Sequence, residues 1–159
     1  MSDEEYVNIL LEQYKIMVSS SEKVTEARQK TNGFFLTLIT SLITLSVIVG
    51  KEFSFSTNSL WIMFTVSLLS LFMSIFWWYT VHSYSLLNKG KFVLIYELEE
   101  KLKSSLFERE WEILKTGVRY KEASYIEKVL VCVVIGATSL LTIIELGFII
   151  FPQIQCTCC

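Results

Sequence analysis

The stretch from Ser59 to Val81 reads SLWIMFTVSLLSLFMSIFWWYTV and contains no charged residue. As an α-helix, about 20 such residues cross the roughly 30 Å hydrocarbon core of a bilayer. Two further stretches, Gly33–Gly50 and Val129–Phe151, have the same character, and the three together contain one charged residue, Glu145. Continuous apolar runs predict spanning helices rather than barrel strands, whose residues alternate. The sequence therefore predicts an all-α integral membrane protein with three transmembrane helices.

The rest of the composition supports this class. Of the 159 residues, 52% are apolar, and there are 14 basic and 16 acidic side chains. The mean hydropathy is +0.48. A soluble globule, a secreted disulfide scaffold and a disordered chain are therefore disfavoured. A net charge of −2, without a large block of one sign, predicts no nucleic-acid surface. The first apolar run follows a mixed-charge segment, unlike the core of a cleavable signal peptide.

Lysine and arginine are distributed unevenly among the segments outside the spans. Segments 1–32 and 82–128 hold four and nine of them, whereas segments 51–58 and 152–159 hold one and none. Cytoplasmic segments of membrane proteins carry an excess of basic residues. This predicts a cytoplasmic N-terminus and a cytoplasmic 82–128 region, with an external hairpin at 51–58 and an external cysteine-rich tail at 152–159.

The two cytoplasmic segments are predicted to be amphipathic helices. In segment 1–32, apolar residues recur at three- and four-residue intervals, which gives one apolar stripe. In segment 82–128, one helix is expected to continue the second span and a shorter one to end near Gly117. These stripes are expected to pack against each other, on the membrane surface or against a neighbouring subunit. The predicted result is a helical layer beneath the membrane.

Each predicted span has a face of hydroxylated or small residues. These residues are Thr37, Thr40, Ser41 and Thr44 in the first span, Ser67, Ser70 and Ser74 in the second, and Cys132, Gly136 and Ser139 in the third. Such faces let helices approach closely and hydrogen-bond across the contact. They are interpreted as packing faces within the three-helix unit, with a hydroxyl-lined pore or an intersubunit seam as the alternative. A pore requires an oligomer, because three helices cannot enclose a channel alone.

Glu145 is the most distinctive residue within the spans. A carboxylate at this depth costs on the order of 3 kcal/mol unless it is paired, protonated or hydrated. Thr138 and Thr142 precede it on the same helical face, and no lysine or arginine occurs in any span. One interpretation is a proton- or cation-handling site, or a polar ring in an oligomer. The other is an acid near the outer headgroups, or one bonded to a threonine of another span.

Signals of catalysis are weak. The chain has no P-loop glycine pattern, serine elbow or metal-binding His/Glu motif. His82 is interpreted as an interfacial anchor. Cys156, Cys158 and Cys159 are compatible with a disulfide or a soft metal, but without accompanying ligands they are interpreted as an oxidation-prone tail. We therefore expect no enzymatic activity, no metal and no cofactor other than bound lipid.

Several short motifs resemble the RipA family of small octameric bacterial inner-membrane proteins. They are Tyr14-Lys-Ile-Met-Val, Ala27-Arg-Gln-Lys-Thr-Asn-Gly-Phe-Phe-Leu, Trp77-Trp78, Ser83-Tyr-Ser-Leu-Leu-Asn-Lys-Gly-Lys-Phe92, Glu110-Trp-Glu112 and Tyr125-Ile-Glu127. The resemblance implies a homo-octamer in a bacterial cytoplasmic membrane, without an established enzymatic activity. A weaker likeness is to SLATT-type membrane effector modules, which are thought to permeabilise membranes; the third span departs from them.

The matched residues fit a role in assembly. Contacts between subunits or with the cytoplasmic layer are predicted for Arg28, Gln29, Asn32, Asn88, Lys89, Lys91, Glu97 and Trp111. Glu97, Glu99 and Glu100 lie near lysines, which suits salt bridges that close a ring. Isolated exposed pairs contribute only about 0–1 kcal/mol, so such bridges would fix the register more than the affinity.

Two functions are compatible with these predictions. The first is a ring-like, homo-oligomeric inner-membrane scaffold whose cytoplasmic helices dock a protein partner. The second is an oligomeric channel or membrane-perturbing effector with a pore lined by hydroxyl and carboxylate groups.

Overall fold

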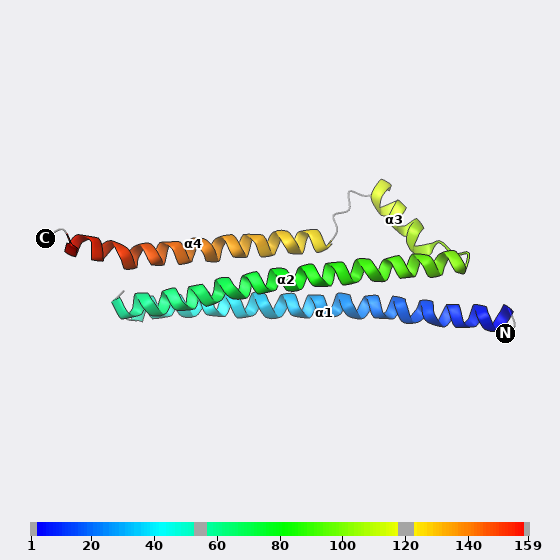
Figure 1. Cartoon of the computed structure of the whole chain (residues 1–159), viewed down its shortest axis with the longest axis horizontal. Coiled ribbons are helices and arrows are strands. Elements are labelled where there is room, and N and C mark those ends of the chain that lie inside the picture. Colours follow the sequence, from blue (N-terminus) through cyan, green and yellow to red (C-terminus); the bar gives the residue numbers. More distant parts are fainter. Residues whose placement is uncertain (1–2, 53–56, 118–122, 158–159) are drawn as a thin grey trace. The chain divides into compact units, whose positions relative to one another are not determined.

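The computed structural model describes the backbone of residues 3–52, 57–117 and 123–157, and the side chains of these residues except 57, 115, 117, 123, 124 and 151–157. The described residues form four α-helices and no strand. These are α1 (Asp3–Glu52), α2 (Thr57–Lys101), α3 (Leu106–Gly117) and α4 (Ala123–Thr157) (Figure 1). Of these helices, α1, α2 and α4 are long and apolar enough to cross a membrane. The predicted all-α membrane class and its three candidate spanning helices are confirmed.

The helices are longer than the predicted spans. Helix α1 joins the predicted segments 1–32 and 33–50 without a break, and α2 continues the second span to Lys101. The only proline of the chain is Pro152, so neither helix contains a residue that removes a helical backbone N–H. Helix α4 extends to Thr157, which places most of the predicted external tail in helical backbone.

The chain divides into two compact units. Unit 1 contains Met1–Lys30 and Val81–Ile126, and unit 2 contains Thr31–Thr80 and Glu127–Cys159. These limits fall within two residues of the predicted ends of the spans. Unit 1 carries 25 of the 30 charged residues. Unit 2 is therefore the apolar, spanning part of the molecule, and unit 1 is the charged part.

In unit 1, a tight turn links α2 to α3. The N–H of Ser104 donates to the carbonyl of Glu99 over 2.9 Å, and that of Lys103 donates to the carbonyl of Glu100 over 3.2 Å. Lys103 has a φ of 52°, in the left-handed region. This combination is the Schellman motif, which satisfies the last carbonyls of a helix and reverses the chain. It brings the start of α3 next to the last turn of α2.

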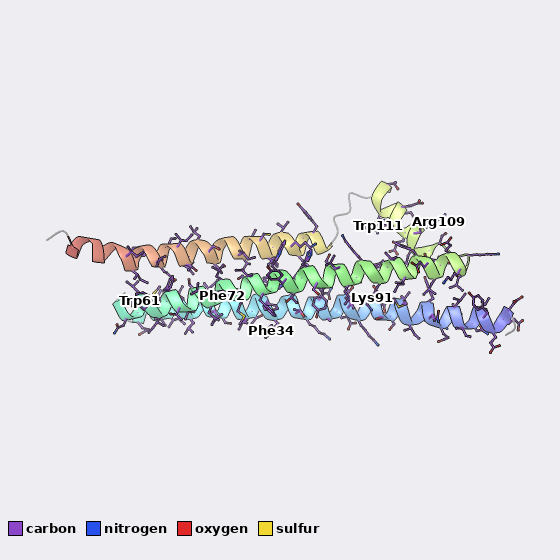
Figure 2. All side chains as sticks on the ribbon, in the orientation of Figure 1. Phe34, Trp61, Phe72, Lys91, Arg109 and Trp111 are labelled. Atoms are coloured by element: carbon purple, nitrogen blue, oxygen red, sulfur yellow. The ribbon has the colours of Figure 1, made fainter. Side chains whose placement is uncertain are left out.

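In unit 2, small hydroxylated side chains are buried and large aromatic side chains are exposed. Ser67, Ser70 and Ser74 of α2 are at most 1% exposed, whereas Phe34 and Phe72 are each 62% exposed (Figure 2). Lipid tails solvate large apolar side chains as well as a protein core does, so spanning helices use small residues where they touch. The burial of these serines shows that α2 meets its neighbours in unit 2 through a small, hydroxylated face.

Candidate functional site

Side-chain hydrogen bonds join helices α1 and α2 in unit 1. Ser21 donates to the side-chain oxygen of Asn88 over 3.0 Å, Lys91 donates to Ser20, and Tyr14 donates to Glu99 over 3.1 Å. Asn88 and Lys91 were predicted to contact another subunit or the cytoplasmic layer. Their bonds lie within one subunit and fix the register of its two antiparallel helices.

Glu99 connects α1, α2 and α3 in unit 1. Its Oε1 accepts from the hydroxyl of Tyr14 on α1 and from the backbone N–H of Phe107 on α3, each over 3.1 Å. Phe107 lies in the first turn of α3, where N–H groups have no partner within the helix and the helix dipole attracts negative charge. Glu99 therefore caps α3 from a neighbouring helix.

The environment of Glu99 differs from the predicted one. Its side chain is 2% exposed, so it is not available for the ring-closing salt bridges expected from the sequence. Among the described residues, its second oxygen, Oε2, has no hydrogen-bond partner. Within the described residues no lysine or arginine forms an ion pair with this carboxylate, and its hydrogen-bond partners lie on α1 and α3.

Glu99 also affects two tyrosines. Burial raises the pKa of the Tyr14 phenol, and the hydrogen bond to Glu99 and its charge raise it further. Burial raises the pKa of Tyr96 as well, together with the charges of Glu99, Glu108 and Glu110. A tyrosinate next to these carboxylates would be repelled. Both phenols are thus held in the protonated form, which Tyr14 needs in order to donate its bond.

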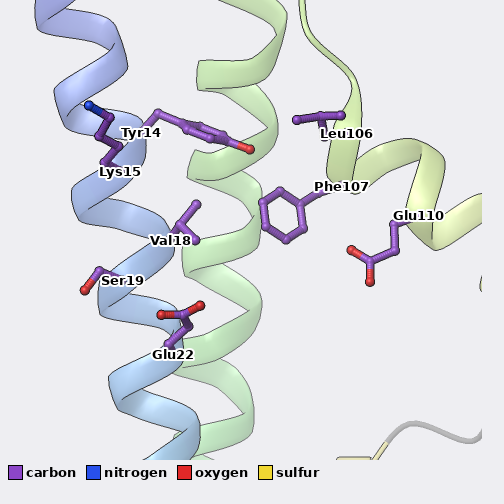
Figure 3. Close-up of a pocket in the computed structure, with 8 residues that line it drawn as sticks. All are labelled: Tyr14, Lys15, Val18, Ser19, Glu22, Leu106, Phe107 and Glu110. Carbon is purple, nitrogen blue, oxygen red and sulfur yellow. The ribbon is translucent and has the colours of Figure 1, made fainter.

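A groove runs between α1 and α3 in unit 1. It has a volume of about 480 Å³ and is lined by Tyr14, Lys15, Val18, Ser19 and Glu22 of α1 and by Leu106, Phe107 and Glu110 of α3 (Figure 3). The rings of Tyr14 and Phe107 are 6.4 Å apart between centroids. The α1–α3 groove therefore has an apolar floor with two carboxylates and one ammonium group at its edges.

The other predicted contact residues of unit 1 occupy different environments. Gln29, Lys89 and Glu97 are exposed, and Trp111 is partly buried. Arg28 is 8% exposed, so the structure places it inside the subunit. Gln29, Lys89 and Glu97 are therefore free to meet a neighbouring subunit.

In unit 2, Asn32 bonds across the helices. Its side-chain oxygen accepts from the indole N–H of Trp77 over 2.9 Å. The ring of Phe35 stacks on that indole at a centroid distance of 6.1 Å. Trp77 is 1% exposed, and a buried indole N–H requires an acceptor. Asn32 is thus a partner within the subunit.

Glu145 lies in the interior of unit 2. Ser46 of α1 donates to its Oε1 over 3.3 Å, and one turn earlier the hydroxyls of Ser67 and Thr142 are 2.8 Å apart. Glu145 is 3% exposed, and in the described residues its Oε2 has no hydrogen-bond partner. Thr138 is 1% exposed. The Thr138–Thr142–Glu145 face is therefore an intramolecular contact of one subunit.

Two of the predicted faces are on the outside of unit 2. Thr37, Thr40, Ser41 and Thr44 of α1 are all exposed. Thr40, Ser41 and Thr44 donate to carbonyls of their own helix. On α4, Cys132 and Gly136 are exposed and Ser139 is partly buried, and a Cβ atom added at Gly136 would meet nothing within 4 Å. These faces remain open for lipid or for another subunit.

The roles of several residues in these sites were not predicted from the sequence. Ser46 follows the buried Phe35 and Ile39 at spacings of eleven and seven, so extending that helical face would have predicted it. The hydrogen bonds of Tyr14, Ser20 and Ser21 were not predicted either. No simple sequence signal identifies the last two, because their partners are 67 to 71 positions away.

The described part of the chain contains no cluster of side chains that could bind a metal ion. No group of three or more His, Cys, Asp or Glu side chains there is arranged to hold a metal ion. Cys132 is a free, exposed cysteine. The side chains of Cys156, Cys158 and Cys159, for which a disulfide, a metal or an oxidation-prone tail was considered, lie outside the described residues.

Comparison with known proteins gives one match. The model of the family described as "Octameric membrane protein family (8xMP)" matches residues 11–147. No curated protein and no solved structure matches the chain. The family match covers both units and confirms the resemblance to an octameric membrane family.

Proposed function

The chain belongs to the octameric membrane protein family, and from this membership we propose that it is a homo-octameric scaffold in a bacterial cytoplasmic membrane. Unit 2 anchors the assembly in the bilayer with lipid bound around it. Unit 1 lies on the cytoplasmic side and docks a protein partner. The scaffold has no enzymatic activity of its own.

The observation that carries this proposal is the uncovered apolar surface of unit 1. This charged unit exposes the large apolar side chains Tyr6, Val7, Ile9, Leu11, Ile16, Leu86, Leu87, Val93, Leu94, Leu106, Ile113, Tyr125 and Ile126. Large apolar side chains left exposed on a charged unit are compatible with an interaction surface. One copy leaves this surface open, so assembly with other copies or with a partner supplies the missing cover.

The orientation rests on charge. Unit 1 contains twelve of the fourteen lysine and arginine residues, and such residues are retained on the cytoplasmic side during insertion. Modification of single cysteines by a membrane-impermeant reagent tests this. A cysteine replacing the exposed Lys23 should react only after the inner membrane is opened. Reaction in intact cells would contradict the proposed orientation.

Native mass spectrometry of the chain in mild detergent tests the assembly. We expect a species of eight subunits that retains lipid. Monomers under these conditions would contradict the scaffold. Planar-bilayer recording of the same preparation separates scaffold from channel, since a scaffold gives no conductance under changes of voltage, pH or tension.

The channel remains the second candidate because one specific observation favours it. The hydroxyl face of Thr37, Thr40, Ser41 and Thr44 lies on the outside of the subunit, where it can line a shared path in a ring. The Thr138–Thr142–Glu145 face does not have this property, since it is buried in unit 2. Conductance that falls on Thr40→Val, with the octamer intact, would favour the channel.

A further inference from the structure

Helix α2 presents an unpartnered apolar stripe in unit 1. It consists of Leu86, Leu87, Gly90, Val93 and Leu94, and the four large side chains are 57%, 51%, 55% and 47% exposed in that order. Gly90, at its centre, is nine positions from both Val81 and Glu99, which are buried. Nine positions are about two and a half helical turns. The stripe therefore lies on the opposite side of α2 from the contacts of its own subunit.

The shape of the stripe suits insertion between two helices. A Cβ atom added at Gly90 would meet nothing within 4 Å, so the backbone is bare between the four apolar side chains. Glycine at such a point allows the close approach of another surface. The stripe thus has two apolar side chains before Gly90, two after it, and a flat surface at Gly90.

The α1–α3 groove has the complementary chemistry. Val18, Leu106 and Phe107 form apolar walls, and Leu106 is 69% exposed. The carboxylates of Glu22 and Glu110 stand at the edges, and within the described residues neither belongs to an ion pair. The ammonium group of Lys15 is already paired with Glu12 over 3.0 Å. The groove therefore offers apolar contact and unpaired negative charge.

Lys89 supplies the matching positive charge. It is exposed and lies next to Gly90 at the border of the stripe. Stripe and groove are different surfaces of the same unit, and both lie outside the predicted spans. Contacts between two different surfaces of identical subunits are head-to-tail, and they form a ring when the rotation between neighbouring subunits closes.

We infer that the α1–α3 groove of one subunit receives the α2 stripe of the next copy, with Lys89 facing Glu22 and Glu110. This inference rests on the proposed homo-oligomer and specifies its interface. The stripe of each subunit then fills the groove of one neighbour, and its groove receives the stripe of the other neighbour. The eight copies are joined in unit 1 by eight equivalent contacts.

Disulfide crosslinking in membranes tests the interface. In a chain whose four cysteines are replaced by serine, Ser19→Cys and Gly90→Cys are made separately and together. Neither single variant should crosslink through these positions, but co-expressed single variants should form dimers. The double variant should form a ladder of species up to eight subunits. Ile16→Cys with Gly90→Cys is the control, because Ile16 is exposed on the side of α1 away from the groove and should give no ladder.

Charge exchange provides the second measurement. Lys89→Glu should lower the apparent assembly constant by about tenfold, the scale of one close charge pair across an interface. Adding Glu22→Lys and Glu110→Lys should restore it. Lys23→Glu, at an exposed position outside the groove, should leave it unchanged.

The possible outcomes separate this interface from the scaffold itself. An intact octamer without the Ser19–Gly90 crosslink overturns the interface and leaves the scaffold standing. Crosslinking of the stripe to a different protein also overturns it. A wild-type chain that is monomeric overturns the scaffold.

Discussion

The hydroxyl of Tyr14 donates a hydrogen bond over 3.1 Å to Oε1 of Glu99, 85 positions further along the chain. The same oxygen accepts from the backbone N–H of Phe107. One carboxylate oxygen thereby holds α1, the end of α2 and the start of α3 together. The α1–α3 groove exists because this contact fixes α3 beside α1.

The first prediction concerns Glu99. Glu99→Leu removes the acceptor for Tyr14 and Phe107, and each polar group left buried without a partner costs about 1–3 kcal/mol. Glu99→Gln retains an acceptor oxygen and should cost much less. Hydrogen exchange of residues 106–117 should accelerate in the leucine variant. Glu100→Leu, at the exposed neighbouring position, is the matched control. Unchanged hydrogen exchange of residues 106–117 in Glu99→Leu would contradict the capping role.

The second prediction is a dependence of unit 1 on alkaline pH. The pKa values of Tyr14 and Tyr96 are raised in the folded chain, mainly by burial. A raised tyrosine pKa gives stability that is complete below the unfolded value of about 10 and is lost as the pH rises through the folded value. Unit 1 should therefore be stable at neutral pH and loosen in strongly alkaline solution.

Tyrosinate absorbance tests this dependence. Tyr14→Phe should remove part of the late-titrating signal, because Tyr14 is one of the two tyrosines concerned. Tyr6→Phe, at an exposed position, controls for the loss of one tyrosine. A late component of unchanged size in Tyr14→Phe would show that Glu99 and burial do not act on Tyr14 as the geometry indicates.

The third prediction concerns Asn32 and Trp77. Side-chain hydrogen bonds within membranes contribute about 0.6 kcal/mol on average and up to about 1.7 kcal/mol. A double-mutant cycle of Asn32→Leu and Trp77→Phe, measured by unfolding in mixed micelles, should yield a coupling energy in that range. Gln29→Leu in place of Asn32→Leu is the control and should show no coupling. Strict additivity of the first pair would mean that the bond is not formed.

The fourth prediction concerns Glu145. Glu145→Gln should leave the octamer intact and its thermal stability equal or higher, since a charged residue at this depth costs about 2.5–3.5 kcal/mol and the amide oxygen still accepts from Ser46. Ser46→Ala should lower stability by only about 0.6 kcal/mol. A Glu145→Gln chain that no longer assembles would show that the carboxylate has a role that the subunit interior does not explain.

The fifth prediction separates the two hydroxyl faces of unit 2. Ser74 is 0% exposed, so Ser74→Leu should overpack the contact and destabilise the subunit by about 1–3 kcal/mol. Ser41 is exposed, and Ser41→Leu should leave subunit stability unchanged. Thermal unfolding in detergent compares the two. Equal destabilisation would mean that the face of Ser41 is also covered within the assembly.

Many of the main structural features followed from local patterns. Three apolar runs with one charged residue between them predicted the spanning helices, and the apolar spacing before Gly117 predicted α3. Small residues on α2 predicted a packing face, which the burial of Ser67, Ser70 and Ser74 supports. These predictions succeed because the length of an apolar run and its helical period depend on neighbouring residues alone.

The partners of individual polar residues could not be read from the sequence. Asn32, Asn88 and Lys91 bond within the subunit, and Glu99 is buried beneath α3. Each has a partner more than 40 positions away or an environment created by the Schellman turn at Lys103. Helical periodicity places a side chain on a face but does not identify the helix that the face meets.

The sequence by itself determined that this chain crosses the membrane with helices and concentrates its charge in one unit, because bilayer thickness and the cost of charge in hydrocarbon act on each segment separately. Only the tertiary structure decided that Glu145 and the serine face are inside the subunit, that the Thr37 face is outside, and that Glu99 caps α3. The physical reason is that burial and hydrogen bonding belong to pairs of helices, and the pairing brings together residues 32 and 77, 46 and 145, or 14 and 99.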